Sequence, residues 1–96
     1  MIFGQRIREL REERGLLQRQ LASILEIDTP MFSKIERGER KAKRSQVILL
    51  AQAFHVNEKE LLSIWLADKV LDTVRNEEEI KDDVIAFVHK EIKTVK

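Results

Sequence analysis

The stretch LQRQLASILEIDTPMFSKIERGERK, from Leu17 to Lys41, decides the fold of this chain, because it encodes two short helices and a tight turn. The first helix begins near Gln18 and has its apolar residues on one side: Leu21, Ala22 and Leu25. Residues 26–28 are too few for anything but a turn. The second helix spans about 29–37, with the only proline of the chain in its first turn, where a missing N–H costs little.

The second of these helices has two unlike sides. On a helical wheel Phe32 and Ile35 point toward one side, which must be the core. The opposite side is small, polar and basic, with Pro30, Ser33, Lys34 and Arg37. Asp28 or Thr29 caps the helix, and we expect Thr29, since the residue before a proline avoids the helical region. Two short helices joined in this way predict a helix-turn-helix, whose second helix enters a DNA major groove.

Charge is unevenly distributed along the 96 residues, although the net charge is only +1. Residues 1–44 contain eleven Lys or Arg and seven Asp or Glu, whereas residues 45–96 contain seven and ten. Five basic residues and one acidic residue lie within residues 37–44. This pattern favours a polyanion-binding face in the first half, with a solvated run of charge as the alternative.

Composition argues against several other classes of protein. The chain has no cysteine, which excludes disulfides, thiolate catalysis and cysteine-ligated zinc. Charge appears already at Arg6, and no apolar run is long enough for a membrane span, so we expect a cytoplasmic protein. His55 and His89 lie in different helices without metal-ligand spacing, and there is no glycine-rich phosphate loop. We therefore expect no enzyme activity, no catalytic residue, no metal and no cofactor.

Apolar spacing predicts an all-α fold of six helices. Besides the two short ones, we expect helices over about 3–14, from a cap at Ser45, from a cap at Asn57 to about Val74, and from a cap at Asn76. The fifth helix is apolar almost all round, so it must be covered on every side. The sixth has an apolar stripe broader than one neighbouring helix needs, which indicates a further interface.

The stretch from Leu17 to Lys41 closely resembles the phage-repressor and Cro-like (XRE) family of regulators. The residues that carry the resemblance are Gln18, Leu21, Ala22, Ile27, Ser33, Ile35, Glu36 and Gly38, with RIRELREERGL before them and LLAQAFHVNEKELL after them. It covers roughly residues 3–66. The chain departs from the family pattern at three positions: Glu26 replaces the usual turn glycine, Ala42 the usual proline, and Leu17 the frequent threonine cap.

The resemblance implies a set of DNA-binding residues. Bases would be contacted by Thr29, Pro30, Ser33 and Lys34, and the DNA backbone by Gln18 and Arg37. Arg19 is a further DNA-binding candidate. Independently of the resemblance, four basic residues lie in the loop beyond the second helix, where phosphates are the nearer targets: Arg40, Lys41, Lys43 and Arg44. Pro30 has no side-chain donor, so it either touches a thymine methyl group or only shapes the start of the helix. The resemblance also implies that Arg11 and Glu36 form a structural salt bridge.

We expect a DNA-binding domain over residues 1–66 and a helical extension over residues 67–96 that forms a homodimer on a palindromic operator. The expected interface residues are Leu62, Trp65, Leu66, Val70, Val84, Phe87, Val88 and Ile92, with a core position for Trp65 as the alternative. In its size and its C-terminal helical extension, the chain resembles a restriction–modification controller protein. The alternative function is an antitoxin-type module that binds a protein partner through the same helices. We expect neither a membrane nor a small-molecule ligand.

Overall fold

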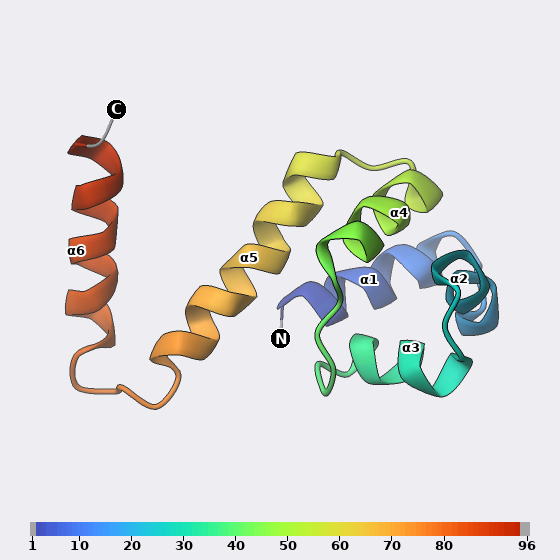
Figure 1. The fold of residues 1–96 in the computed structure, drawn as a ribbon, viewed down its shortest axis with the longest axis horizontal. Helices are drawn as coiled ribbons and strands as arrows, with labels where there is room; N and C mark the ends of the chain where they lie inside the picture. Colours follow the sequence, from blue (N-terminus) through green and yellow to red (C-terminus); the bar gives the residue numbers. More distant parts are fainter. Residues whose placement is uncertain (1, 95–96) are drawn as a thin grey trace.

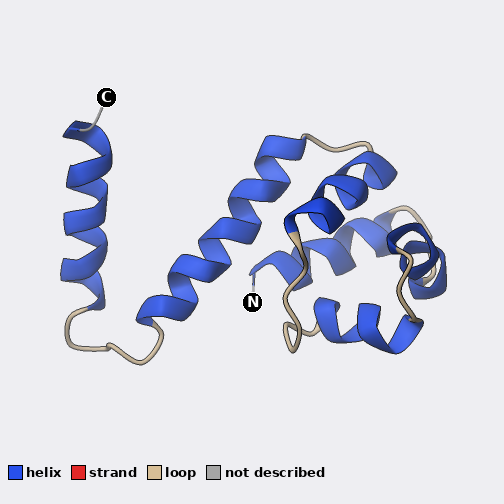
Figure 2. Ribbon diagram, viewed as in Figure 1, coloured by secondary structure: helices blue, strands red, loops and turns tan. Residues whose placement is uncertain are grey.

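Six helices and no strand make up the regular structure of residues 2–94 in this computed structural model (Figure 1 and Figure 2). Met1, Val95 and Lys96 lie outside the described residues. The helices are α1 (Ile2–Glu13), α2 (Gln18–Leu25), α3 (Thr29–Glu36), α4 (Arg44–Phe54), α5 (Glu58–Val74) and α6 (Lys81–Thr94). The predicted all-α, six-helix fold is confirmed.

Helices α1 to α5 enclose one hydrophobic core, and α6 stands apart from it (Figure 1). The largest fully buried side chains come from α1, α2, α3 and α4: Ile7, Leu10, Leu21, Phe32, Val47, Leu50 and Phe54. Burying a side chain of this size stabilises the fold by about 1.5–3 kcal/mol. Because α2 and α3 have only 8 residues each, this packing rather than helix propensity keeps them helical.

The turn between α2 and α3 has a left-handed residue where the family usually has glycine. Glu26 has φ 57° and ψ 42°, and its N–H donates to the carbonyl oxygens of Ala22 and Ser23. The next residue, Ile27, donates to the Ala22 carbonyl oxygen at 3.0 Å. These bonds close α2 and offset the cost of a side chain in the left-handed region.

Asp28, not Thr29, caps α3. Its Oδ1 accepts a hydrogen bond from the backbone N–H of Met31 at 2.8 Å, and Thr29 is already helical. The prediction of Thr29 as the cap was therefore wrong. The preference of a pre-proline residue for extended backbone is small, and the Asp28 hydrogen bond outweighs it.

The predicted starts of two other helices were also wrong. Helix α4 begins one residue before Ser45, and its first turn is closed by the Gln46 side chain, which accepts from the N–H of Lys43 at 2.8 Å. Helix α6 begins at Lys81, because residues 75–80 form turns rather than a helix capped by Asn76. The Asn57 cap and the end of α5 at Val74 are confirmed, with Asn57 Oδ1 accepting from Glu60 N–H at 2.9 Å.

Helix α5 anchors the start of α1 through a buried carboxylate that the sequence analysis missed. Asp68 is only 5% exposed, and its two oxygens accept from the N–H groups of Ile2 and Phe3 at 2.8 and 2.7 Å. The first N–H groups of a helix have no partner within the helix, so Asp68 satisfies two of them. The sequence feature that could have predicted this contact is an aspartate within an otherwise apolar helix.

The expectation that α5 is covered on every side is only half right. Leu61, Leu62 and Trp65 are buried, but Leu66, Val70 and Leu71 are exposed. No described residue of α6 is buried, and its stripe of Ile85, Phe87, Val88 and Ile92 faces solvent in the single chain. The second half of α5 and all of α6 therefore present uncovered apolar surface.

Helices α1 and α3 approach most closely at Gly4. A Cβ atom placed there would lie 2.3 Å from the carbonyl oxygen of Glu36 and 2.9 Å from that of Ile35. Both atoms belong to the backbone at the end of α3 and cannot rotate away. Only glycine lets α1 pack against α3 at this distance.

Gly4→Ala should therefore destabilise the fold by about 1–3 kcal/mol, because the two helices must separate. Thermal unfolding measures this change as a melting temperature lower by several degrees. Gln5→Ala, at the exposed neighbouring position, is the control and should stay within about 0.5 kcal/mol of wild type. Equal melting temperatures for Gly4→Ala and Gln5→Ala would contradict the close contact.

Candidate nucleic-acid interface

The two sides of α3 face as the helical wheel predicted. Phe32 and Ile35 are 0% and 3% exposed, so they fix this helix in the core. Pro30, Lys34 and Arg37 are exposed, and Thr29 and Ser33 are half-buried. The core thus holds α3 with a short polar and basic surface turned outward.

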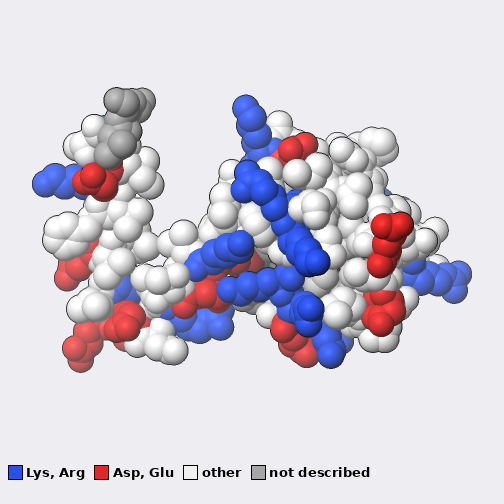
Figure 3. Space-filling view, in the orientation of Figure 1, with Lys and Arg blue, Asp and Glu red and all other residues white. Residues whose placement is uncertain are grey.

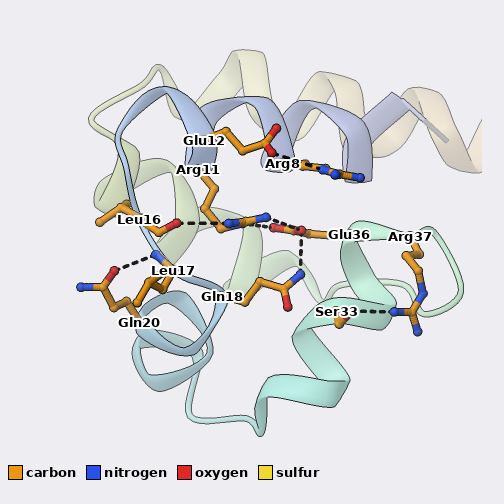
Figure 4. Close-up of polar contacts among 10 residues, drawn as sticks. All are labelled: Arg8, Arg11, Glu12, Leu16, Leu17, Gln18, Gln20, Ser33, Glu36 and Arg37. Atoms are coloured by element: carbon orange, nitrogen blue, oxygen red, sulfur yellow. Dashed lines mark hydrogen bonds and ion pairs between the residues drawn. The ribbon is translucent and has the colours of Figure 1, made fainter.

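The inner end of α3 is fixed by a three-residue polar network (Figure 4). Glu36 is 8% exposed and accepts from Arg11 Nε at 2.7 Å, Arg11 Nη2 at 3.2 Å and Gln18 Nε2 at 3.0 Å. Arg11 also donates to the carbonyl oxygen of Leu16 at 3.1 Å. The hydrogen bond with Glu36 raises the pKa of Arg11 above its usual value. One carboxylate therefore ties α3 to both α1 and α2.

Gln18 takes part in this network rather than pointing freely outward. Its amide nitrogen carries two hydrogens, so it can bond Glu36 and still donate to a phosphate. The helix that it begins has no side-chain cap at Leu17. Instead, Gln20 Oε1 accepts from the N–H of Leu17 at 2.7 Å, which replaces part of the missing cap (Figure 4).

The exposed side of α3, near the same C-terminal end, has a second polar cluster. Arg37 Nη1 donates to the hydroxyl of Ser33 at 2.6 Å, and the Arg37 guanidinium forms an ion pair with Glu39 (Figure 4 shows the Ser33 contact). The hydrogen bond between Arg37 and Glu39 raises the pKa of the first and lowers that of the second. The structure thus joins Ser33 and Arg37, which the sequence analysis treated as separate contacts.

A cleft of about 300 Å³ opens between α1, α2 and α3 on the same side of the molecule. Its lining comprises Arg8, Arg11, Gln18, Ser33, Glu36 and Arg37. Sequence reasoning missed Arg8, which pairs with Glu12 at 3.7 Å. The signal was its place three residues before Arg11, which puts both side chains on one side of α1. Three arginines line the cleft, and each of them is already paired with a carboxylate.

The basic loop between α3 and α4 is exposed but anchored. Trp65 Nε1 donates to the carbonyl oxygen of Ala42 at 2.9 Å, and Lys41 Nζ lies 2.9 Å from Asp72 Oδ2. Arg40, Lys43 and Arg44 point into solvent. Figure 3 shows Lys and Arg side chains gathered in the middle of one face, with acidic side chains among them. The loop therefore presents several cations from a fixed backbone.

Metal-ligating side chains do not cluster in the part of the chain that the structure describes. Residues 2–94 contain no group of three or more His, Cys, Asp or Glu side chains placed to hold a metal ion. His55 ends α4 in a left-handed conformation and is exposed, as is His89 on α6. Within the same residues, no helix is both long and apolar enough to cross a membrane.

Two short helices at a tight turn, the second held by Glu36 and backed by the core, define a helix-turn-helix domain. The chain belongs to the helix-turn-helix domain family, whose model matches residues 2–63. It carries a DNA-binding domain of the kind found in transcriptional regulators, a family that is typically non-enzymatic.

A curated relative supports this assignment. Over 62 residues the chain is 34% identical to the HTH-type transcriptional regulator DdrOP3 of Deinococcus deserti. The alignment covers 65% of this chain and 48% of the relative, so the chain matches about half the length of that protein. No solved structure matches this chain.

Removing one member of the Arg11–Glu36 pair should destabilise the domain, because the other charge remains buried without its partner. We expect a cost of about 3 kcal/mol for Glu36→Gln or Arg11→Met, measured by chemical or thermal unfolding. Glu13→Gln, an exposed carboxylate on α1, is the control and should change stability little. If Glu36→Gln unfolds like the control, the pair does not hold α3.

Proposed function

We propose that this protein is a sequence-specific regulator that binds a palindromic double-stranded DNA operator as a homodimer, with α3 in the major groove. The observation that carries the proposal is the outward face of α3, which the core and Glu36 hold in a fixed position beside a basic loop. A rigid support is what base recognition needs, because bidentate contacts depend on side-chain position.

The dimensions of α3 suit the major groove. An α-helix with its side chains is about 10–12 Å across, which fits the major groove width of about 12 Å, and the 8 residues of α3 make it about 12 Å long. We assign base contacts to Thr29, Pro30, Ser33 and Lys34. Lys34 is exposed one turn into the helix, where its ammonium group can reach a guanine edge.

Phosphate contacts form a separate group in this proposal. They come from the start of α2, the end of α3, the following loop and the first residue of α4: Gln18, Arg19, Arg37, Arg40, Lys41, Lys43 and Arg44. Phosphate contacts position the protein on the duplex and carry no sequence information directly. Their anchored backbone keeps them at a fixed distance from α3.

The proposed dimer uses the surface that α5 and α6 leave uncovered. Phe87 and Ile92 are 75% and 65% exposed, and Leu66, Val70 and Val88 lie open as well. With Leu71, Ile80 and Ile85, these side chains expose on the order of several hundred Å² of apolar surface, the scale of a standard interface at about 800 Å² per partner. An isolated helix of 14 residues is marginal in water, so α6 needs a partner.

Two of the residues expected in the dimer interface lie in the core of their own chain. Leu62 and Trp65 are each 8% exposed there, so we leave both out of the proposed interface. For Trp65 this matches the core position given as its alternative. Val84 is half-buried, and the remaining expected interface residues are exposed. We propose residues 1–66 as the DNA-binding part and residues 67–96 as the dimerisation part.

A protein-binding module is the second candidate, because the same apolar stripe on α6 also fits a partner of another sequence. A restriction–modification controller or another regulator would use the stripe for self-association, whereas an antitoxin-type protein would use it for a toxin. The oligomeric state of the purified protein distinguishes these two candidate functions, because only a stripe used for self-association gives a dimer when no other protein is present.

The first test separates base reading from phosphate binding. Lys34→Ala should flatten the preference at one base pair of each half-site, where a base contact is worth about 1–3 kcal/mol. Lys43→Ala or Arg44→Ala should weaken operator and random duplex by similar factors and reduce the salt slope by roughly one. Titrations against operator, single-base variants and random duplex at several salt concentrations measure both. Equal weakening of all duplexes by Lys34→Ala would remove Lys34 from base reading.

The second test concerns the dimer. Phe87→Asp should place a charge in the apolar interface and halve the mass that light scattering reports at micromolar concentration. Ala86→Asp adds the same charge at an exposed position on the other side of α6 and should remain dimeric. Operator affinity should fall only for Phe87→Asp. A wild-type protein that stays monomeric, alone and on DNA, would contradict the proposed dimer.

A further inference from the structure

Lys41, one of the proposed phosphate contacts, is already paired within the chain. Its Nζ lies 2.9 Å from Oδ2 of Asp72, which belongs to α5. The two side chains are 56% and 20% exposed, so the pair lies at the surface, with Asp72 half-buried. Within residues 2–94, Arg40, Lys43 and Arg44 have no such carboxylate partner. Lys41 is thus different from the rest of the basic loop.

The backbone around Lys41 cannot carry it away from Asp72. The next residue, Ala42, is 5% exposed, and its carbonyl oxygen is held by the buried Trp65 Nε1 at 2.9 Å. The Trp65 ring is covered by Lys69, whose Nζ lies 3.7 Å from the ring centroid. The loop backbone is thus bonded to α5 directly beside Lys41. In the structure the Lys41 side chain points to Asp72.

Asp72 has a second cation that remains when Lys41 leaves. Arg75, one turn further along α5, also bonds the Asp72 carboxylate. The hydrogen bond from Lys41, followed by the charge of Arg75, lowers the pKa of Asp72, so it stays ionised at neutral pH. Release of Lys41 therefore does not leave the Asp72 charge alone. Breaking the Lys41–Asp72 ion pair therefore costs little free energy, and a new ion pair between Lys41 and a phosphate can offset it.

A DNA phosphate and the Asp72 carboxylate need the same cation. To bind a phosphate, the Lys41 ammonium group must point toward the DNA. In the free protein, the same group is paired with the Asp72 carboxylate, which neutralises its charge. Exposed ion pairs of this kind are weak, so Lys41 can leave Asp72 and bind a phosphate. The free energy of the lost Lys41–Asp72 pair is then subtracted from the free energy of DNA binding. The exchange is the same whatever the base sequence.

We propose that Asp72 competes with DNA for Lys41 and thereby lowers the affinity of the protein for every duplex. This inference rests on the proposed DNA-binding function, and it adds a residue of α5 that limits the strength of phosphate binding. Because the effect acts through one phosphate contact, it weakens binding to operator and non-operator DNA alike and does not alter which bases are read. Asp72 is a positioning residue in this account, since it acts only through Lys41.

The test is a double-mutant cycle on Asp72 and Lys41. Asp72→Asn keeps the shape of the side chain and removes its charge. It should tighten binding to operator and random duplex alike, by roughly two- to five-fold at low salt, as expected for a weak exposed pair. In the Lys41→Ala background the same change should have little effect. Thermal unfolding of each variant checks that the fold is kept.

Glu79→Gln is the matched control, because it removes an exposed carboxylate without touching Lys41. It should raise affinity less than Asp72→Asn does. Unchanged or weaker binding by Asp72→Asn overturns the inference, and so does a gain of equal size in the Lys41→Ala background, which would be a general charge effect. If wild type binds DNA without any sequence preference, the proposed function fails, while the cycle still decides the role of Asp72. If wild type binds no duplex, both fail.

Discussion

The carboxylate of Glu36 is the contact on which the proposed DNA-reading surface depends. It is the last residue of α3, it is almost fully buried, and it receives hydrogen bonds from Arg11 on α1 and Gln18 on α2. A buried charge must be compensated, so moving any of the three helices apart would leave Glu36 without one of its partners. Gly4 permits this packing because a larger residue would collide with the end of α3.

Helix α5 connects the helix-turn-helix domain to α6. On its inner side Asp68 satisfies the first N–H groups of α1, and Trp65 holds the basic loop through Ala42. On its outer side the second half of the helix is apolar and uncovered, and it leads to α6. One helix thus positions the proposed phosphate contacts and also offers the proposed dimer surface. In the proposed dimer, α5 sets the spacing of the two DNA-binding domains.

Sequence periodicity predicted the features that depend on local pattern. The inward side of α3, given by Phe32 and Ile35, and the short turn before it follow directly from spacing. The choice between neighbouring caps was less predictable, as Asp28 shows, because several polar residues qualify and packing selects one. Contacts such as Asp68 with the start of α1 join residues about 65 apart, and no local pattern encodes them. For the proposed DNA contacts, sequence supplies the residue types, and the structure adds the partners that already hold some of them.

Selection of bound duplexes from a random-sequence library with the purified full chain tests the central claim most directly. The account predicts one enriched motif with two-fold symmetry, whose half-sites are centred about 10–10.5 base pairs apart or a multiple of that spacing. Such a motif requires two copies of α3 held in a fixed relation by the same protein. Recovery of no preferred sequence, or of a single half-site with no symmetric mate, would contradict it.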